Sequence, residues 1–88
     1  MDVIHKYEID AHGGKIELPK GAMVLSTGVQ NDKFFIWVIT TLTAMQTELR
    51  RFKAYATGEV MDDANREFIG TVFVSSLVFH IFEIKGDI

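Results

Sequence analysis

The segment from Arg50 to Tyr55 holds the side chains best suited to binding an anion. If this segment is a strand, Arg51, Lys53 and Tyr55 project from one face, because side chains alternate along a strand. Two cations and an aromatic ring on one face can hold phosphate groups and stack against a base. In a helix, Arg51 and Tyr55 still share a face. Arg50, Arg51, Lys53 and Tyr55 are therefore candidate ligand-binding residues; the alternative is a solvated strand face around a core phenylalanine.

Three aromatic residues are candidates for an interface or a binding platform. Trp37, Phe73 and Phe79 lie in apolar stretches, and tryptophan is enriched in protein interfaces because it combines a large apolar surface with a polar N–H group. Trp37 can instead be an ordinary core aromatic, and this interpretation is favoured. Because several aromatic residues compete for one small interior, we expect part of this aromatic surface to contact a partner.

The sequence lacks the residue patterns typical of catalysis or metal binding. There is no cysteine, and His5, His12 and His80 are far apart, without the paired spacing of metal ligands. No serine lies in a glycine elbow. The glycine pair at 13–14 lacks the further residues of a phosphate-binding loop. We therefore expect a protein that is not an enzyme and that uses no metal or cofactor.

Length and composition predict one small domain over residues 1–88. Hydrophobic residues make up 48% of the chain, and a chain this short gains stability by burying apolar surface against copies of itself, so we expect a homo-oligomer. A net charge of −3 does not favour nucleic-acid binding. The longest apolar run, Phe34–Ile39, is too short to span a bilayer, and no secretory signal is evident. These features favour a cytoplasmic protein.

Alternation of apolar and polar residues predicts a mainly β fold. The run Phe34–Ile39 is apolar on both faces, which is typical of a central strand covered on both sides, or on one side by a partner subunit. The two glycines within 12–15 predict a hairpin turn. The predicted strands lie at 3–9, 16–18, 23–29, 34–39, 68–74 and 77–84, and the last two are either joined by a tight turn at 75–76 or form one long strand with a bend there. The expected architecture is a small antiparallel β-sandwich or barrel of about six or seven strands.

The stretch 42–56 is ambiguous between helix and strand. Leu42, Met45, Leu49 and Phe52 recur at helical spacing among good helix formers, so periodicity alone slightly favours a helix. A strand would instead place alternate residues of the same stretch on opposite faces. One short helix here would make the fold α+β.

Several short motifs resemble a family of small uncharacterised proteins from bacteriophages and prophages. The matching motifs lie at 4–7, 16–22, around Trp37, and at 48–52, 57–58, 68–72 and 78–83. The chain departs from the family pattern at Ala56, Val60 and Phe79, where glycine, proline and tryptophan are usual. The resemblance implies a phage or prophage origin and a predominantly β domain, and it favours a strand over 48–57. It carries no catalytic residues.

These observations together predict a non-enzymatic phage accessory protein that acts by binding inside the bacterial host cell. The leading hypothesis is that it counters antiviral immunity, either by sequestering a nucleotide-derived signal or by blocking a host defence protein. This hypothesis rests on analogy with other small phage proteins. The alternatives are a structural or assembly component of the phage particle, and a weak nucleic-acid-binding accessory protein.

Overall fold

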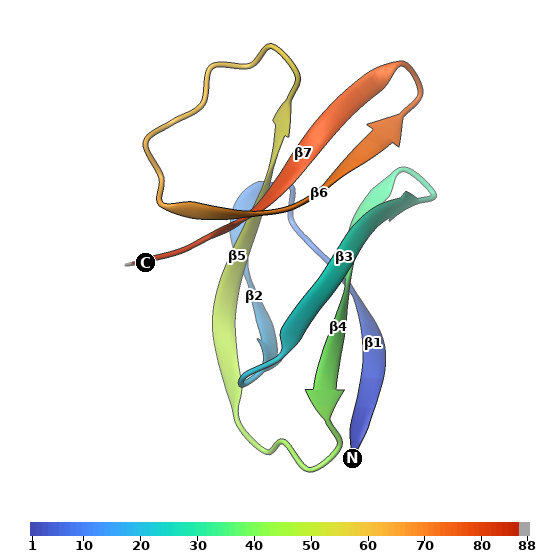
Figure 1. Cartoon of the computed structure of the whole chain (residues 1–88), viewed down its shortest axis with the longest axis vertical. Helices are drawn as coiled ribbons and strands as arrows, with labels where there is room; N and C mark the ends of the chain where they lie inside the picture. Colours follow the sequence, from blue (N-terminus) through green and yellow to red (C-terminus); the bar gives the residue numbers. More distant parts are fainter. Residues whose placement is uncertain (87–88) are drawn as a thin grey trace.

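The computed structural model of this chain describes residues 1–86 and contains seven antiparallel strands in two sheets (Figure 1). The strands are β1 (Asp2–Glu8), β2 (His12–Pro19), β3 (Met23–Gln30), β4 (Lys33–Thr41), β5 (Thr47–Ala56), β6 (Arg66–Val74) and β7 (Leu77–Ile84). No helix occurs among the described residues. The mainly β, sandwich-like fold expected from the alternation is therefore confirmed. None of residues 1–86 forms a helix of the length and apolar character that crossing a membrane requires.

The first sheet has the strand order β1-β4-β3, with β4 at its centre. The central position of β4 agrees with the apolar character of both its faces. A two-residue turn joins β3 to β4, with Asn31 and Asp32 at φ angles of 52° and 62°. Asparagine and aspartate tolerate this left-handed backbone better than most residues, so the turn follows from the sequence.

The second sheet has the order β2-β5-β7-β6. The hairpin expected at 12–15 is wrong, because β1 and β2 belong to different sheets. The two glycines lie instead in an irregular stretch of β2, where the register against β5 shifts between His12 and Lys15. Gly13 has a φ of +93°, a conformation that favours glycine in a bulge as much as in a turn.

The helix favoured by periodicity at 42–56 is also wrong. Residues 47–56 form β5, which lies between β2 and β7 as an inner strand. The supposed helical face does not face a core, because Leu42 and Met45 remain 60% and 95% exposed. Phe52, in contrast, is 1% exposed. Pairing along both edges of β5 and the burial of Phe52 outweigh the local helix preference of this segment.

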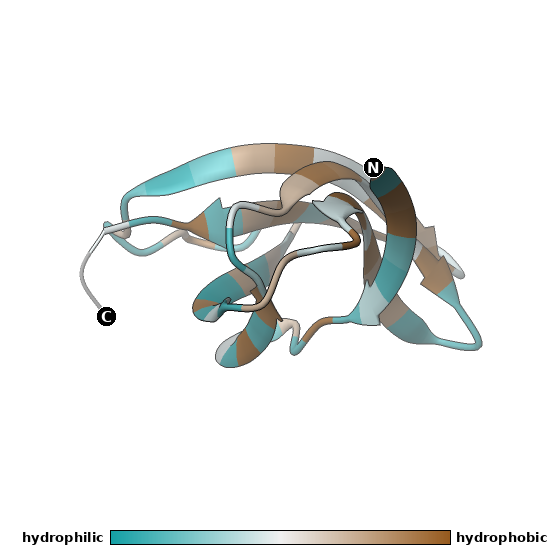
Figure 2. Ribbon diagram, turned by 90° about the horizontal axis from the view of Figure 1, so that it is seen from below, coloured by the Kyte–Doolittle hydropathy of each residue, from teal (hydrophilic) through white to brown (hydrophobic). Residues whose placement is uncertain are grey.

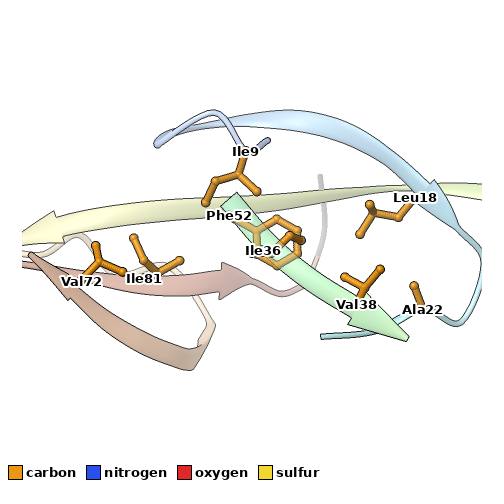
Figure 3. Packing of buried hydrophobic residues seen from close by; sticks show 8 residues of the cluster. All are labelled: Ile9, Leu18, Ala22, Ile36, Val38, Phe52, Val72 and Ile81. Atoms are coloured by element: carbon orange, nitrogen blue, oxygen red, sulfur yellow. The ribbon is translucent and has the colours of Figure 1, made fainter. Parts of the chain in front are cut away.

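The core lies between the two sheets (Figure 3). Its buried side chains come from both sheets and from the loops beside them: Ile9, Leu18, Ala22, Ile36, Val38, Phe52, Val72 and Ile81. Figure 2 shows the two layers nearly end-on, with hydrophobic and hydrophilic residues alternating along the strands. The rings of Phe34 and Phe79 meet edge-to-face across the sheets at 5.4 Å. Where β6 approaches β3, a Cβ atom on Gly70 would lie 3.1 Å from the Thr27 methyl group, so a larger residue would have to displace that methyl group by a few tenths of an ångström.

Candidate functional site

Arg50 lies on the core side of β5, where it forms part of the fold. Its Nε and Nη2 atoms donate to the two Glu83 carboxylate oxygens at 2.7 and 2.9 Å, and its Nη1 donates to the Ala22 carbonyl at 2.6 Å. The pKa of Arg50 is raised, first by the hydrogen bond to Glu83. Burial alone would raise the pKa of Glu83, but the hydrogen bond and charge of Arg50 outweigh burial and lower it. The Arg50 guanidinium is therefore engaged within the chain.

Arg51 lies on the opposite, outer face of β5, where the structure brings further basic groups beside it. Lys15 of β2 stands directly across from Arg51, and His12 stands across from Lys53. The Arg51 Nε donates to the Gly13 carbonyl at 2.7 Å. Lys15 and His12 were not among the residues predicted from the sequence, because their proximity depends on the β2–β5 register. Together, Lys15, Arg51 and Lys53 form a basic strip.

Lys53 and Tyr55 meet at a third residue, Asp62, in the segment 57–65 that connects β5 to β6. The Lys53 Nζ and the Tyr55 hydroxyl donate to the two Asp62 carboxylate oxygens at 2.9 and 3.0 Å. Arg66 lies over the Tyr55 ring and donates to the Asp62 carbonyl. Tyr55 is only 2% exposed. The segment 57–65 thus covers the ring that the sequence suggested as a stacking surface.

The hydrogen bonds to Asp62 shift the ionisation of this cluster. The donors Lys53, the Ala64 amide and Tyr55 lower the pKa of Asp62 to about 2. The hydrogen bond to Asp62 raises the pKa of Lys53. Burial, followed by the hydrogen bond to Asp62, raises the pKa of Tyr55. At neutral pH the carboxylate therefore holds the segment 57–65 against the outer face of the sheet as a charged latch.

Acidification is expected to release this latch. A carboxylate whose pKa is depressed on folding contributes stability above its ordinary pKa of about 3.9, and this contribution is lost as the pH falls through about 2. NMR titration of the Ala64 amide and the Tyr55 ring should show a midpoint near pH 2 that disappears in Asp62→Asn. The neighbouring Asp63→Asn variant should keep the midpoint. A midpoint near pH 4 in the unsubstituted protein would show that Asp62 makes no such latch.

An apolar pocket of about 280 Å³ lies between the segment 57–65 and the outer face of the second sheet. Its lining comes from β5, β6, β7 and the segment itself: Tyr55, Ala56, Thr57, Gly58, Glu59, Met61, Phe68, His80 and Phe82. The His80 ring nitrogens contact the hydroxyls of Thr57 and Thr71 at 2.9 and 3.1 Å. Both ring nitrogens of His80 are therefore already engaged by threonine hydroxyls.

Trp37 lies on the outer face of the first sheet. Its neighbours Ile36 and Val38 are fully buried on the core side, so alternation turns Trp37 outward. We define the Trp37 face as Ile4 of β1, Met23 of β3, and Phe35, Trp37 and Ile39 of β4; the register pairs Ile39 with both Ile4 and Met23. Ile4 and Met23 are 58% and 61% exposed. This face is the apolar surface that the two-sided pattern of β4 predicted.

The Trp37 ring packs against a glycine of the neighbouring strand. The indole ring lies over Gly28 of β3, where an added Cβ atom would come within 3.0 Å of the ring. The Lys6 ammonium lies 4.7 Å from the centre of the Phe35 ring and donates to Gln30 at 2.8 Å, so this side chain extends from β1 across β4 to β3 at the Phe35 end of the face. The rest of the face, from Trp37 to Ile39, carries the apolar surface.

The other two aromatic candidates do not share this face. Phe73 lies on β6 of the second sheet and is 70% exposed. Phe79 packs against the core beside Phe34. The structure therefore separates Trp37, Phe73 and Phe79 into one outer sheet face, one exposed strand position and one core position.

Comparison with known proteins adds a family but no activity. No convergent group of three metal-ligating side chains occurs among residues 1–86. Neither the curated proteins nor the solved structures contain a match to this chain. One family of domains matches residues 1–87, nearly the whole sequence. The chain thus belongs to the family described as a domain of unknown function, DUF7352.

Proposed function

We propose that this chain is a non-enzymatic binding protein that binds another protein through the Trp37 face. The biological role we propose, from the resemblance to phage and prophage proteins, is that of an accessory protein that blocks a host defence protein. The observation that carries the proposal is the apolar surface around Trp37, on which Ile4 and Met23 are exposed. The largest contiguous apolar patch on the surface of a protein is often the site of an interaction.

The polar contacts of β5 favour this proposal over sequestration of a small ligand. A phosphate-binding site needs cations whose donors are available to the ligand. Arg50 instead donates to Glu83 and Ala22, and Lys53 donates to Asp62. The Tyr55 ring is buried under the segment 57–65. Of the four ligand-binding residues predicted from the sequence, two are therefore already paired with acidic side chains, and a third is covered by the segment 57–65.

A second candidate function is the binding of a phosphate-bearing ligand by the basic strip. Lys15, Arg51 and Lys53 lie side by side on the outer face of the β2–β5 pair, and the Arg51 Nη groups form no ion pair within residues 1–86. Such a strip could hold a phosphate-bearing ligand, for example a nucleotide-derived signal. We rank this candidate second, because Asp62 already neutralises one of its three cations.

Native mass spectrometry of the protein isolated from infected bacterial cells tests the two candidates together. The proposal predicts a complex that contains a host protein and that is lost in Ile39→Lys, which places a charge in the Trp37 face. The matched control Leu49→Lys, at an exposed position of the second sheet, should keep the complex. A small added mass that Arg51→Ala abolishes would favour the second candidate. Recovery of the chain from purified phage particles, with no host protein bound, would indicate a structural component instead.

A further inference from the structure

The outer edge of β1 is a strand edge with unpaired backbone groups. β1 is the terminal strand of the first sheet, visible in dark blue beside β4 in Figure 1. The Ile9 amide donates to the Phe34 carbonyl, and the Leu42 amide donates to the Met1 carbonyl. In an antiparallel pair, groups that point toward the partner alternate with groups that point away. The odd-numbered residues of β1 therefore bond to β4, and the N–H and C=O groups of Asp2, Ile4, Lys6 and Glu8 point outward.

This edge lacks most of the features that normally prevent strand pairing. Proteins protect strand edges with charged side chains, proline, bulges or short strands, and of these β1 carries only charges, at Asp2, Lys6 and Glu8. The β2 strand ends in Pro19 and has an irregular register, and β3 and β6 each carry a register shift. In contrast, β1 pairs with β4 in one continuous register from Asp2 to Glu8, and it contains neither glycine nor proline. Its side chains at positions 2, 4, 6 and 8 are all exposed.

The charges along β1 are complementary to a second copy of the same strand. Asp2 and Lys6 lie at equal distances on either side of Ile4. If two β1 strands pair antiparallel with Ile4 opposite Ile4, each Asp2 lies directly opposite the Lys6 of the other copy. In this arrangement Lys6 exchanges its hydrogen bond to Gln30 for the contact with Asp2. The three pairs formed at 2, 4 and 6 use the outward backbone groups. We propose that this chain self-associates through β1, in a two-fold dimer centred on Ile4.

The two registers shifted toward the C-terminal end of β1 are less favourable. Shifting the centre to His5 sets Asp2 opposite Glu8, and shifting it to Lys6 sets two lysines opposite each other. Like charges placed directly opposite are destabilising, whereas opposite charges stabilise a cross-strand pair. The proposed dimer depends on the β1 edge, whereas the proposed function depends on the Trp37 face. Either proposal can therefore be wrong while the other holds.

Single-cysteine variants test the register, because the chain contains no cysteine. Directly opposed residues of a hydrogen-bonded antiparallel pair have Cα atoms about 5.5 Å apart, within the range that a disulfide spans. Ile4→Cys is therefore expected to form a disulfide-linked dimer much faster than the control Leu49→Cys, at a similarly exposed position. A mixture of Asp2→Cys and Lys6→Cys should cross-link, whereas each alone should not. Equal rates for Ile4→Cys and Leu49→Cys would overturn the proposal.

Charge variants test the same interface without a covalent bond. Asp2→Lys alone or Lys6→Asp alone sets like charges opposite each other twice per dimer, and each is expected to weaken association about tenfold. The double variant with both changes should restore the affinity of the unsubstituted chain. Sedimentation equilibrium measures each dissociation constant, and circular dichroism confirms that each variant is folded. An unsubstituted protein that remains monomeric up to about 1 mM, or a double variant no better than the singles, would exclude this dimer.

Discussion

Glu83→Ala is expected to lower the free energy of unfolding by about 3–5 kcal/mol. The carboxylate side chain is 6% exposed and forms a two-point ion pair with Arg50, whose own side chain is 14% exposed. Removing Glu83 leaves the buried guanidinium with only the Ala22 carbonyl and a long contact to Glu48, at 3.8 Å. Because the arginine cannot lose its proton, the uncompensated charge stays in the protein interior.

Urea unfolding of three variants distinguishes the contribution of the Arg50–Glu83 ion pair to stability from that of the neighbouring contacts. Glu48→Ala removes the more exposed contact of Arg50 and should cost less than about 1 kcal/mol. Replacing both members of the pair, as Arg50→Met with Glu83→Leu, removes both charges at once and should recover most of the loss of Glu83→Ala. If Glu83→Ala costs no more than Glu48→Ala, the pair is not a structural element. Arg50→Ala should also unfold the protein more easily, so it is unsuited to testing ligand binding.

Trp37→Ala is expected to weaken binding of the proposed protein partner by about 2–4 kcal/mol, or roughly 30- to 1000-fold. Trp37 is the largest side chain of the Trp37 face and lies at its centre, between Phe35 and Ile39 on β4. Central tryptophans carry much of the binding energy of protein interfaces, because neighbouring residues exclude water from around them. Truncation removes the part of the ring that is still accessible in the free chain and would be covered by the partner.

Phe73→Ala is the control, because Phe73 is an aromatic residue that is 70% exposed but belongs to the second sheet. It should change the affinity by less than about 0.5 kcal/mol. Isothermal titration with the partner identified by native mass spectrometry gives both values, and circular dichroism verifies that both variants are folded. Equal losses for the two variants would show that binding does not depend on the Trp37 face.

Most of the fold could be predicted from local patterns in the sequence. The two-residue alternation from Val3 to Ile9 corresponds to β1 and the residue that follows it, and the two apolar faces of the Phe34 stretch correspond to a central strand. Local patterns failed where tertiary contacts decide. The helical spacing around Leu49 predicted a helix, but β5 pairs with a neighbouring strand on each side. The glycines after His12 form an irregular part of a strand, because the chain changes sheets before them.

The candidate site was less predictable, since its chemistry depends on residues that are distant in sequence. Alternation correctly set Arg51, Lys53 and Tyr55 apart from Arg50. It could not show that Glu83, 33 residues away, neutralises Arg50, or that Asp62 engages Lys53 and Tyr55. A search for acidic residues able to pair with each cation would have produced several candidates. Only the strand register and the path of segment 57–65 select among them.

The narrowness of the Trp37 face limits how the protein can act on a target. Three strands about 4.8 Å apart and about seven residues long make a strip of roughly 14 by 24 Å, or about 340 Å² of flat area. A partner in a stable complex of standard size contributes about 800 Å². A target held by this strip alone therefore forms an interface below the standard size, of the kind found in transient complexes. To keep such a target occupied, the concentration of free protein must exceed the dissociation constant, so the amount of protein in the cell sets the strength of the effect.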